Sequence, residues 1–367
     1  MTALLTQSFL RSNPLSDLTA RYKVAVRRHR EFPNLVFVKY DQIESPMAEP
    51  IVQECRGLIL DEADDWSVVS FPFRKFFNHG EGHAAPIDWA SARVYEKLDG
   101  SLMTLYWYGG GWRVASNGLP DASGAVEGRA GTFADLFWDT FKEAGYAVPS
   151  ERHRGLCYMF EMTTPYNRVV VQHARPRVTL IGCRDLEDGN YPELAPESPA
   201  AELGWECVRC FPLTSADACL SAAKQLRAIE AEGFVACDAR FNRVKIKSPQ
   251  YVALALMKES FSARRMLEVV KANETEEFLT YFPEMRPLYE QVRARWESVC
   301  AAVEAEYARL TAIPTQKEFA AQATKTRFSA ALFALRAGKA ESVRQYFTTC
   351  SQPALERVML DGIEFTL

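Results

Sequence analysis

The sequence lacks a membrane-spanning run, a secretion signal and a cysteine framework. No apolar stretch approaches the roughly 20 residues needed to cross a bilayer. Residues 1–10 carry no basic segment followed by an apolar run, as a signal peptide would. The 9 cysteines are odd in number and scattered, which fits free thiols in a reducing compartment. We therefore expect a cytoplasmic protein with no membrane partner.

Three familiar site motifs are also missing. Cys207 and Cys210 form a C-x-x-C, but no second pair accompanies it, so a zinc site is not expected. In residues 79–83 the glutamate is misplaced for a metalloprotease helix, and two glycines disfavour helix. The chain has no P-loop, so any end-healing kinase-phosphatase would be a separate partner.

An excess of positive charge is absent as well. The chain has 43 Lys and Arg against 47 Asp and Glu, a net charge of −4. A nucleic-acid partner would therefore have to meet a local basic groove rather than a field from the whole protein. The length of 367 residues suggests two domains.

The first two thirds of the chain is rich in β-forming segments separated by turn signals, which indicates antiparallel sheets. Gly109, Gly110 and Gly111 predict a hairpin. The expected strands cover residues 35–40, 54–61, 68–73, 102–108, 112–116, 156–162, 168–172, 178–186, 233–237 and 243–247. Helices are expected over residues 15–29, 131–144 and 215–232, the last capped by Thr214 and Asp217.

The pattern changes to helices near residue 252. Apolar residues then recur every three or four positions, and Thr315 to Glu318 resembles a capping box. The apolar stripe comprises Leu288, Val292, Trp296, Val299, Val303, Tyr307 and Leu310. We therefore predict an α+β protein, with an antiparallel β-rich domain over residues 1–253 and an all-helical domain over residues 254–367.

Residues 95–102 carry the first chemical signal. Lys97 ends an expected strand, and Asp99 and Gly100 permit a tight turn after it. A nucleophilic lysine must be neutral, although its ordinary pKa is near 10.4, and neighbouring cations help to lower that pKa. Lys245 and Lys247 share one face of an expected strand, where two lysines are tolerated if they share an anion such as phosphate.

Two carboxylates lie in apolar strand settings. Glu161 is flanked by Phe160 and Met162, and Glu232 directly precedes an expected strand. A carboxylate at the edge of a buried strand needs a cation, a metal or a ligand hydroxyl as its partner. Mg²⁺ bound with ATP would be such a partner.

Together these pieces resemble the covalent nucleotidyltransferases. Residues 97–100 (Lys-Leu-Asp-Gly) resemble motif I of that superfamily, and residues 160–162 resemble motif III. Residues 232–235 (Glu-Gly-Phe-Val) resemble motif IV, and residues 245–248 (Lys-Ile-Lys-Ser) resemble motif V, in the same order.

An upstream block narrows the resemblance to the RNA ligase 1 family, the phage type associated with tRNA repair. It comprises Glu-Cys-Arg-Gly at residues 54–57, Arg-Lys-Phe-Phe-Asn at residues 74–78, and Glu81. The likeness covers about residues 35–252, including an N-terminal ATP-binding extension. The helical domain agrees in position with the family's tRNA-recognition domain, although no motif matches there.

The resemblance implies an ATP-dependent RNA ligase in the cytoplasm of a bacterial or phage-infected cell. Lys97 would form lysyl-AMP, and the AMP would then pass to the 5′-phosphate of an RNA. Finally, a 3′-OH would attack this activated phosphate, which joins the two RNA ends and releases AMP. The cofactors would be ATP and Mg²⁺, with Mn²⁺ as a substitute, and Glu161 would act toward the metal. The implied nucleotide-binding residues are Tyr40, Arg56, Lys75, Asp99, Glu161, Glu232, Lys245 and Lys247.

Three further positions are implied, and one departs from the family. Gly100 belongs to motif I, and Tyr251 aligns with a tyrosine important in ligation. Asn117 stands where the prototype carries a lysine; an amide donates hydrogen bonds but carries no charge. Arg113 is a candidate for that lysine's role.

Two alternatives stay open at this point. One is another covalent nucleotidyltransferase, such as a DNA ligase or a capping guanylyltransferase, although no segment resembles a C-terminal OB-fold. The other is a degenerate nucleotide- or RNA-binding module, which the intact set of charged motif residues disfavours.

Overall fold

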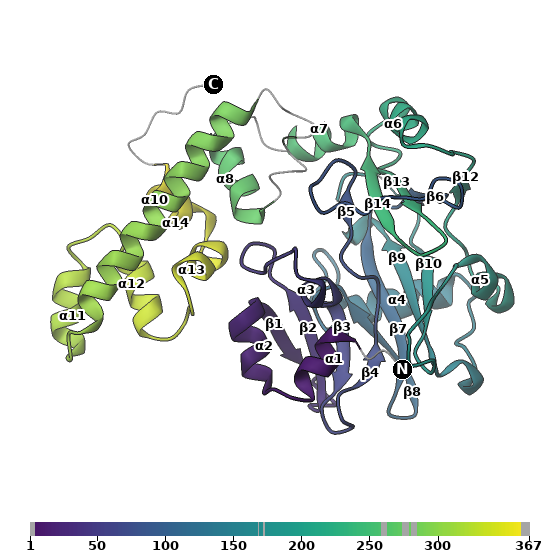
Figure 1. Cartoon of the computed structure of the whole chain (residues 1–367), viewed down its shortest axis with the longest axis horizontal. Helices are drawn as coiled ribbons and strands as arrows, with labels where there is room; N and C mark the ends of the chain where they lie inside the picture. Colours follow the sequence, from purple (N-terminus) through teal and green to yellow (C-terminus); the bar gives the residue numbers. More distant parts are fainter. Residues whose placement is uncertain are drawn as a thin grey trace. The chain divides into compact units, whose positions relative to one another are not determined.

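The chain divides into two compact units. The structure is a computed structural model, and it describes residues 4–167, 169–171, 173–257, 263–273, 279 and 285–360. One unit comprises Met1–Asp41 and Ser45–Ala255, and the other comprises Gln42–Glu44 and Leu256–Leu367 (Figure 1). The first unit holds the strands, and the described part of the second is helical. The expected α+β class, with antiparallel sheets and C-terminal helices, is confirmed.

Three sheets build the first unit. The first has the order β1-β2-β3-β4, the second β11-β10-β9-β7-β8, and the third β12-β6-β13-β14-β5. The pairings are antiparallel except that of β14 with β5. The strands are β1 (Val24–Arg28), β2 (Leu35–Tyr40), β3 (Arg56–Asp61), β4 (Ser67–Ser70), β5 (Phe77–Asn78), β6 (Arg93–Lys97), β7 (Ser101–Tyr108), β8 (Gly111–Ser116), β9 (Leu156–Thr163), β10 (Arg177–Asp185), β11 (Glu193–Leu194), β12 (Cys210–Phe211), β13 (Gly233–Cys237) and β14 (Arg243–Lys247).

Helices cover one face of each sheet (Figure 1). Short helices α1, α2 and α3 pack on the first sheet, α4 on the second, and α6 on the third. The helical elements of this unit are α1 (Leu5–Leu10), α2 (Leu15–Tyr22), α3 (Pro50–Glu54), α4 (Phe133–Glu143), α5 (Glu197–Leu203), α6 (Ala216–Gln225), and the 3₁₀ turns Glu151–His153 and Pro165–Asn167.

The third sheet shows how alternation divides its two faces. Val244 and Ile246 of β14 are buried beside Cys219 and Ala223 of α6. Lys245 and Lys247 alternate with them and are only partly buried. The predicted placement of both lysines on one strand face is therefore confirmed, and that face is turned away from α6.

Several element predictions need correction. The helix expected over residues 15–29 ends at Tyr22, because Lys23 takes a left-handed conformation (φ 55°) and residues 24–28 pair with β2. β4 ends at Ser70 rather than at residue 73, and α6 ends at Gln225 rather than at residue 232. Sequence patterns do not show where a strand partner will compete with a helix.

Two local predictions also fail. The cap of α6 is Ser215, whose side chain accepts the N–H of Ala218, rather than Thr214 or Asp217. Residues 169–171 form a bend instead of a strand. Residues 168 and 172 of that expected strand lie outside the described residues.

The second unit is built around the long helix α10 (Arg286–Thr311). The apolar stripe predicted for this helix is buried, except that Tyr307 is only partly buried. Thr315 caps α11 by accepting the N–H of Glu318. The other helices are α7 (Pro249–Met257), which spans the division between the units, α8 (Ala263–Ala272), α11 (Gln316–Ala323), α12 (Ser329–Arg336), α13 (Val343–Thr349) and α14 (Gln352–Met359).

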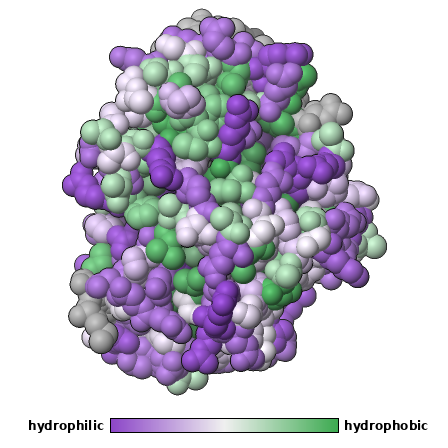
Figure 2. Space-filling view, turned by 90° about the vertical axis from the view of Figure 1, so that its right-hand side faces the viewer, coloured by the Kyte–Doolittle hydropathy of each residue, from purple (hydrophilic) through white to green (hydrophobic). Residues whose placement is uncertain are grey.

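Hydrophilic and hydrophobic residues are mixed over the face of the molecule drawn in Figure 2. Scattered apolar side chains are normal on a folded protein's surface. No helix in the described part of the chain combines the length and apolarity that a bilayer crossing requires.

Gly182 on β10 is closely packed against neighbouring side chains, so a substitution there tests the packing of the core. A Cβ built there would lie 2.5 Å from Cζ of Phe73 and 3.0 Å from Cε of Met159. We expect Gly182→Ala to lower the free energy of unfolding by about 1–3 kcal/mol, because the Phe73 ring must shift within a filled core. Urea denaturation measures this change. Gly111→Ala is the matched control, since nothing lies within 4 Å of its added Cβ; equal effects of the two variants would contradict the packing argument.

Candidate active site

A cavity of about 260 Å³ lies between the second and third sheets. Lys97, Val235 and Lys245 line it from the third sheet, on the face opposite to α6. Leu102 and Glu161 line it from the second sheet. Apolar walls with a few charged groups at one site are typical of a pocket for a small ligand. The motif residues, distant in sequence, therefore meet around one cavity.

The register of three strands brings Lys97, Glu232 and Lys247 together. Gly233 of β13 is opposite Lys97 of β6 on one side and Lys247 of β14 on the other. Glu232 directly precedes Gly233, so its carboxylate lies between the two lysines. Nζ of Lys97 is 2.6 Å from Oε2 of Glu232, and Nζ of Lys247 is 3.5 Å from Oε1. One buried carboxylate thus holds two lysines at the site.

Gly233 permits this close approach. Its φ is +151°, and a Cβ there would lie 2.2 Å from the carbonyl oxygen of Ile246. A side chain at this position would therefore push β13 away from β14. In the Glu-Gly-Phe-Val motif, Gly233 allows the two strands to approach closely, whereas Glu232 provides a carboxylate to the site.

Burial raises the pKa of the Glu161 carboxyl to about 7. The Lys97 and Arg56 cations oppose this rise, and the Glu232 carboxylate adds to it. A cation that approaches a carboxyl in this setting would favour its ionised form. The setting therefore fits a hydrated divalent cation, which favours oxygen ligands and keeps most of its waters.

The metal would have to be held largely by water and by phosphate. No group of three or more His, Cys, Asp or Glu is arranged around a common metal position in the described ranges. Mg²⁺ is commonly bound through one or two carboxylates together with substrate phosphates. A carboxylate in the position of Glu161 would meet the protein's part of that requirement.

Arg56 and Asn117 line the cavity, and each has a buried polar atom without a hydrogen-bond partner. The atoms are Nη1 of Arg56, a donor, and Oδ1 of Asn117, an acceptor. Buried polar groups in folded proteins are nearly always paired, so these two atoms are suited to a bound ligand. Arg113, the candidate substitute for the missing lysine, instead pairs with Glu31 at 3.2 Å and does not line the cavity.

Asp99 lies behind the cavity rather than in its wall. Its Oδ2 accepts the N–H groups of Val170 and Val171 at 2.8 and 2.7 Å, and its Oδ1 accepts the hydroxyl of Tyr251 at 2.7 Å. The geometry gives Asp99 and Tyr251 a positioning role beside Lys97. Gly100 is also positional, since a Cβ there would lie 2.3 Å from the carbonyl oxygen of Met162.

Tyr40 and Lys75 do not line the cavity themselves, but they lie close to Arg56, which does. Nζ of Lys75 lies 5.0 Å from the centre of the Tyr40 ring. Burial raises the pKa of Tyr40, but the Arg56, Lys75 and Lys39 cations and a hydrogen bond from Lys75 outweigh burial, so the net pKa falls. This positive potential suits an anion with several phosphates.

The upstream block supports the third sheet. β5 contributes Asn78, which is opposite Lys245 of β14. Glu81 accepts the backbone N–H of Asn78 at 3.0 Å. The block therefore places strand β5 next to a motif V lysine.

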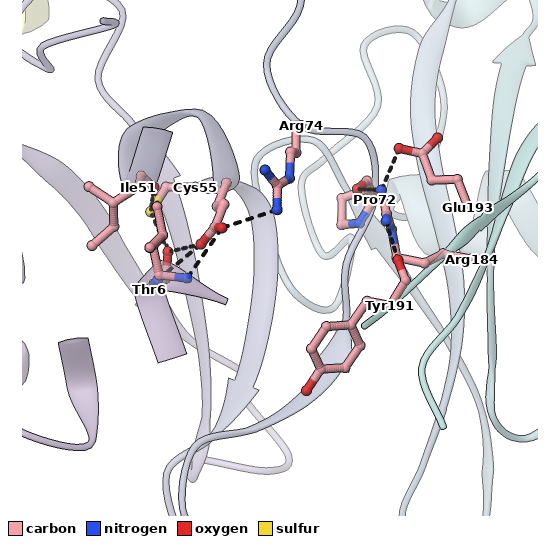
Figure 3. Close-up of polar contacts among 10 residues, drawn as sticks. Thr6, Ile51, Cys55, Pro72, Arg74, Arg184, Tyr191 and Glu193 are labelled. Carbon is pink, nitrogen blue, oxygen red and sulfur yellow. Dashed lines mark hydrogen bonds and ion pairs between the residues drawn. The ribbon is translucent and has the colours of Figure 1, made fainter. Parts of the chain in front are cut away.

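A buried charge network escaped the sequence prediction. Arg184 is held by Glu193 at 2.6 Å, and Glu193 also pairs with Arg243 at 2.5 Å. Dashed lines in Figure 3 join Arg184 to Glu193, Pro72 and Tyr191. Strand alternation places Arg243 on the face of Lys245, but no local pattern identifies Glu193 as its partner.

We expect Lys97 and Glu232 to be strongly coupled in a double-mutant cycle. Lys97→Met, Glu232→Gln and the double variant should give a coupling energy of about 1–3 kcal/mol in urea unfolding, because the carboxylate is buried. The exposed pair Arg227 and Glu230, 2.8 Å apart, is the control, with a coupling below about 0.5 kcal/mol. Similar values for both pairs would contradict the arrangement.

Tyr251→Phe should lower the free energy of unfolding by about 1–3 kcal/mol, because it removes a hydrogen bond from a buried carboxylate. Thermal or urea unfolding measures the loss. Tyr166→Phe is the control, since Tyr166 is 45% exposed. If Tyr251→Phe is as stable as this control, the positioning role of the Tyr251 hydroxyl is wrong.

Comparison with known proteins agrees with this site. A family model described as RNA ligase matches residues 54–251. A putative bifunctional polynucleotide kinase/RNA ligase of Autographa californica nuclear polyhedrosis virus is 28% identical over 299 residues, covering 76% of this chain and 41% of that protein. An RNA ligase of Rhodothermus phage RM378 is 27% identical over 311 residues, covering 66% and 70% respectively. RNA ligase 1 of bacteriophage TS2126 is 32% identical over 177 residues, covering 46% and 43%.

The chain therefore spans less than half the length of two of these relatives. Among solved structures, an archaeal ATP-dependent RNA ligase aligns with a TM-score of 0.48 and 17% identity over 78% of each chain. The family match is the finding that identifies the chain. Because the matched residues 54–251 make up more than half of the 367 residues and contain all four motifs, the chain belongs to the RNA ligase family, as its resemblance to the RNA ligase 1 type indicated.

Proposed function

We propose that this protein is an ATP-dependent RNA ligase that joins 5′-phosphate and 3′-OH ends of RNA. The observation that carries the proposal is the cluster of Lys97, Glu232 and Lys247 beside a cavity that Lys97, Arg56 and Lys245 line. A lysine held by a carboxylate among cations suits covalent transfer of a nucleotide.

In the first step, Nζ of Lys97 attacks the α-phosphorus of ATP. The new bond is N–P, the bond from the α-phosphorus to the bridging oxygen breaks, and pyrophosphate leaves. Glu232, 2.6 Å from Nζ, is placed to accept the proton that Lys97 gives up. Arg56, Lys75, Lys245 and Lys247 supply positive charge for the triphosphate and for the charge that develops on pyrophosphate.

A divalent cation bound with ATP would reduce the negative charge of its phosphates. Glu161 is the residue proposed to reach Mg²⁺ through water, and Mn²⁺ is proposed as a substitute. The RNA ligase of Naegleria gruberi has been solved with ATP and Mn.

In the second step, a 5′-phosphate of RNA attacks the α-phosphorus and Lys97 leaves, so that a 5′-5′ pyrophosphate forms. In the third step, a 3′-OH attacks the activated phosphate and AMP leaves. Both transfers depend chiefly on positioning and on cations near the developing charge. Asp99 and Tyr251 hold the loop after Lys97 and thereby help to fix its position.

RNA repair, with an anticodon-nicked tRNA as substrate, is the proposed biological setting. A polynucleotide kinase-phosphatase is the proposed partner, because ligation needs a 5′-phosphate and a 3′-OH. The relative from Autographa californica nuclear polyhedrosis virus is named as a putative bifunctional polynucleotide kinase/RNA ligase. We propose the cytoplasm as the location and the helical unit, residues 254–367, as the RNA-recognition domain.

Labelling of the protein by ATP tests this function. Incubation with α-labelled ATP and Mg²⁺ should leave label on the denatured wild-type protein and none on Lys97→Ala, because the label is held by the Lys97 N–P bond. Subsequent addition of 5′-phosphorylated RNA should discharge the label and yield circular or joined RNA. Labelling by GTP instead of ATP would indicate a capping-type enzyme.

Two controls make the outcome decisive. Mass spectrometry of the purified protein reveals AMP that is already bound and would block labelling. Circular dichroism confirms that Lys97→Ala is folded. Absence of both label and bound AMP in the wild type would overturn the proposal.

A further inference from the structure

A second cleft opens beside the nucleotide cavity, within the same unit. Its volume is about 460 Å³, and Phe76, Phe241 and Arg243 line both the cleft and the cavity. These three residues therefore form a wall that the cleft and the cavity share. A ligand in the cleft would lie next to a nucleotide in the cavity.

The lining of this cleft is basic, although the whole chain has a net charge of −4. Five arginine and lysine side chains line it, against one carboxylate, that of Glu193. Glu193 is already shared by Arg184 and Arg243, at 2.6 and 2.5 Å. Arg74 pairs with Glu54, which lies outside the lining, and among the described residues no ion pair reaches Lys75 or Arg240. The charges of Lys75 and Arg240 therefore favour a polyanion.

Arg74 and Arg240 come from two different elements. Arg74 donates to the buried carboxylate of Glu54 at 3.2 Å (Figure 3), and that carboxylate also accepts the N–H groups of Leu5 and Thr6. Arg240 is exposed, and within the described part of the chain no ion pair reaches it. Arg240 is thus available to an incoming anion.

The turn that carries Arg240 is held rigidly. Oδ1 of Asp238 accepts the N–H groups of Arg240 and Asn242 at 2.9 and 3.0 Å, and Oδ2 accepts Nδ2 of Asn242 at 2.9 Å. Phe241 is held at a φ of +60°, in the left-handed region. Such a conformation is unfavourable for a residue other than glycine and is maintained by its surroundings. The turn therefore holds an arginine and an aromatic ring at the junction of the two spaces.

We propose that this cleft binds the phosphate backbone of the single-stranded RNA end whose 5′-phosphate is activated in the adjoining cavity. Cations beside aromatic rings are the features that bind single-stranded nucleic acid. Arg240 contacts a backbone phosphate, and Phe241 provides a ring at the entrance to the cavity. This inference rests on the proposed ligase function and names where its RNA lies.

The test is binding of an RNA that cannot be joined. A 5′-phosphorylated single-stranded RNA with a fluorophore on its 3′ end is titrated with wild type, Arg240→Gln and Arg240→Lys at several salt concentrations, by fluorescence anisotropy. Loss of one phosphate contact should lower the slope of log K against log salt by about 0.7 and the affinity at 0.1 M salt by about 5-fold. Arg240→Lys should keep the wild-type slope.

Arg227→Gln is the matched control, because Arg227 is also exposed on this unit and pairs with Glu230; its RNA binding should equal that of wild type. Lysyl-AMP formation from ATP is measured on every variant. Normal labelling with an unchanged salt slope in Arg240→Gln would overturn the cleft proposal alone. Unchanged RNA binding with a higher ATP requirement would assign the cleft to the triphosphate instead. Absence of labelling in wild type would overturn the ligase proposal itself.

Discussion

The sharing of one carboxylate by two lysines is the interaction on which the rest of the site depends. Lys97 and Lys247 come from strands on either side of β13, and their positive charges repel each other. Glu232 lies between them because Gly233 pairs with both lysines in register, and Gly233 has no side chain to separate β13 from β14. The Lys97 amine is thereby held at the cavity, and the neighbouring cations suit a ligand that carries phosphates.

Further buried contacts hold the segments around the cavity in place. The carboxylate of Asp99 accepts hydrogen bonds from Val170, Val171 and Tyr251. These bonds connect the loop after Lys97 to two segments that are distant in sequence. On the other side of the cavity, Glu193 joins Arg184 to Arg243. Rigid support of this kind would reduce the reorganisation needed at each proposed transfer step. Arg243, one of these supports, also belongs to the wall that the cavity shares with the basic cleft.

Predictions from the sequence succeeded where they depended on residues close together in the chain. They failed where a segment's structure depends on pairing with a distant strand. Strand alternation correctly placed Lys245 and Lys247 on one face, and the hairpin between β7 and β8 was correct. The end of α2 was missed, because residues after Lys23 pair with a strand that the local pattern does not reveal. Tyr251, in contrast, proved to be a hydrogen-bond partner of Asp99, which no spacing rule indicates.

The sequence by itself determined the motif set, the family resemblance and the change from strands to helices, because these depend on residue type and spacing along the chain. Only the tertiary structure decided which charges meet. The pairing of Lys97 with Glu232 spans 135 positions, and the network of Glu193 joins β10, β11 and β14, which belong to two different sheets. Such contacts depend on how sheets pack, and the energy of a charge depends on burial, which a linear sequence does not specify.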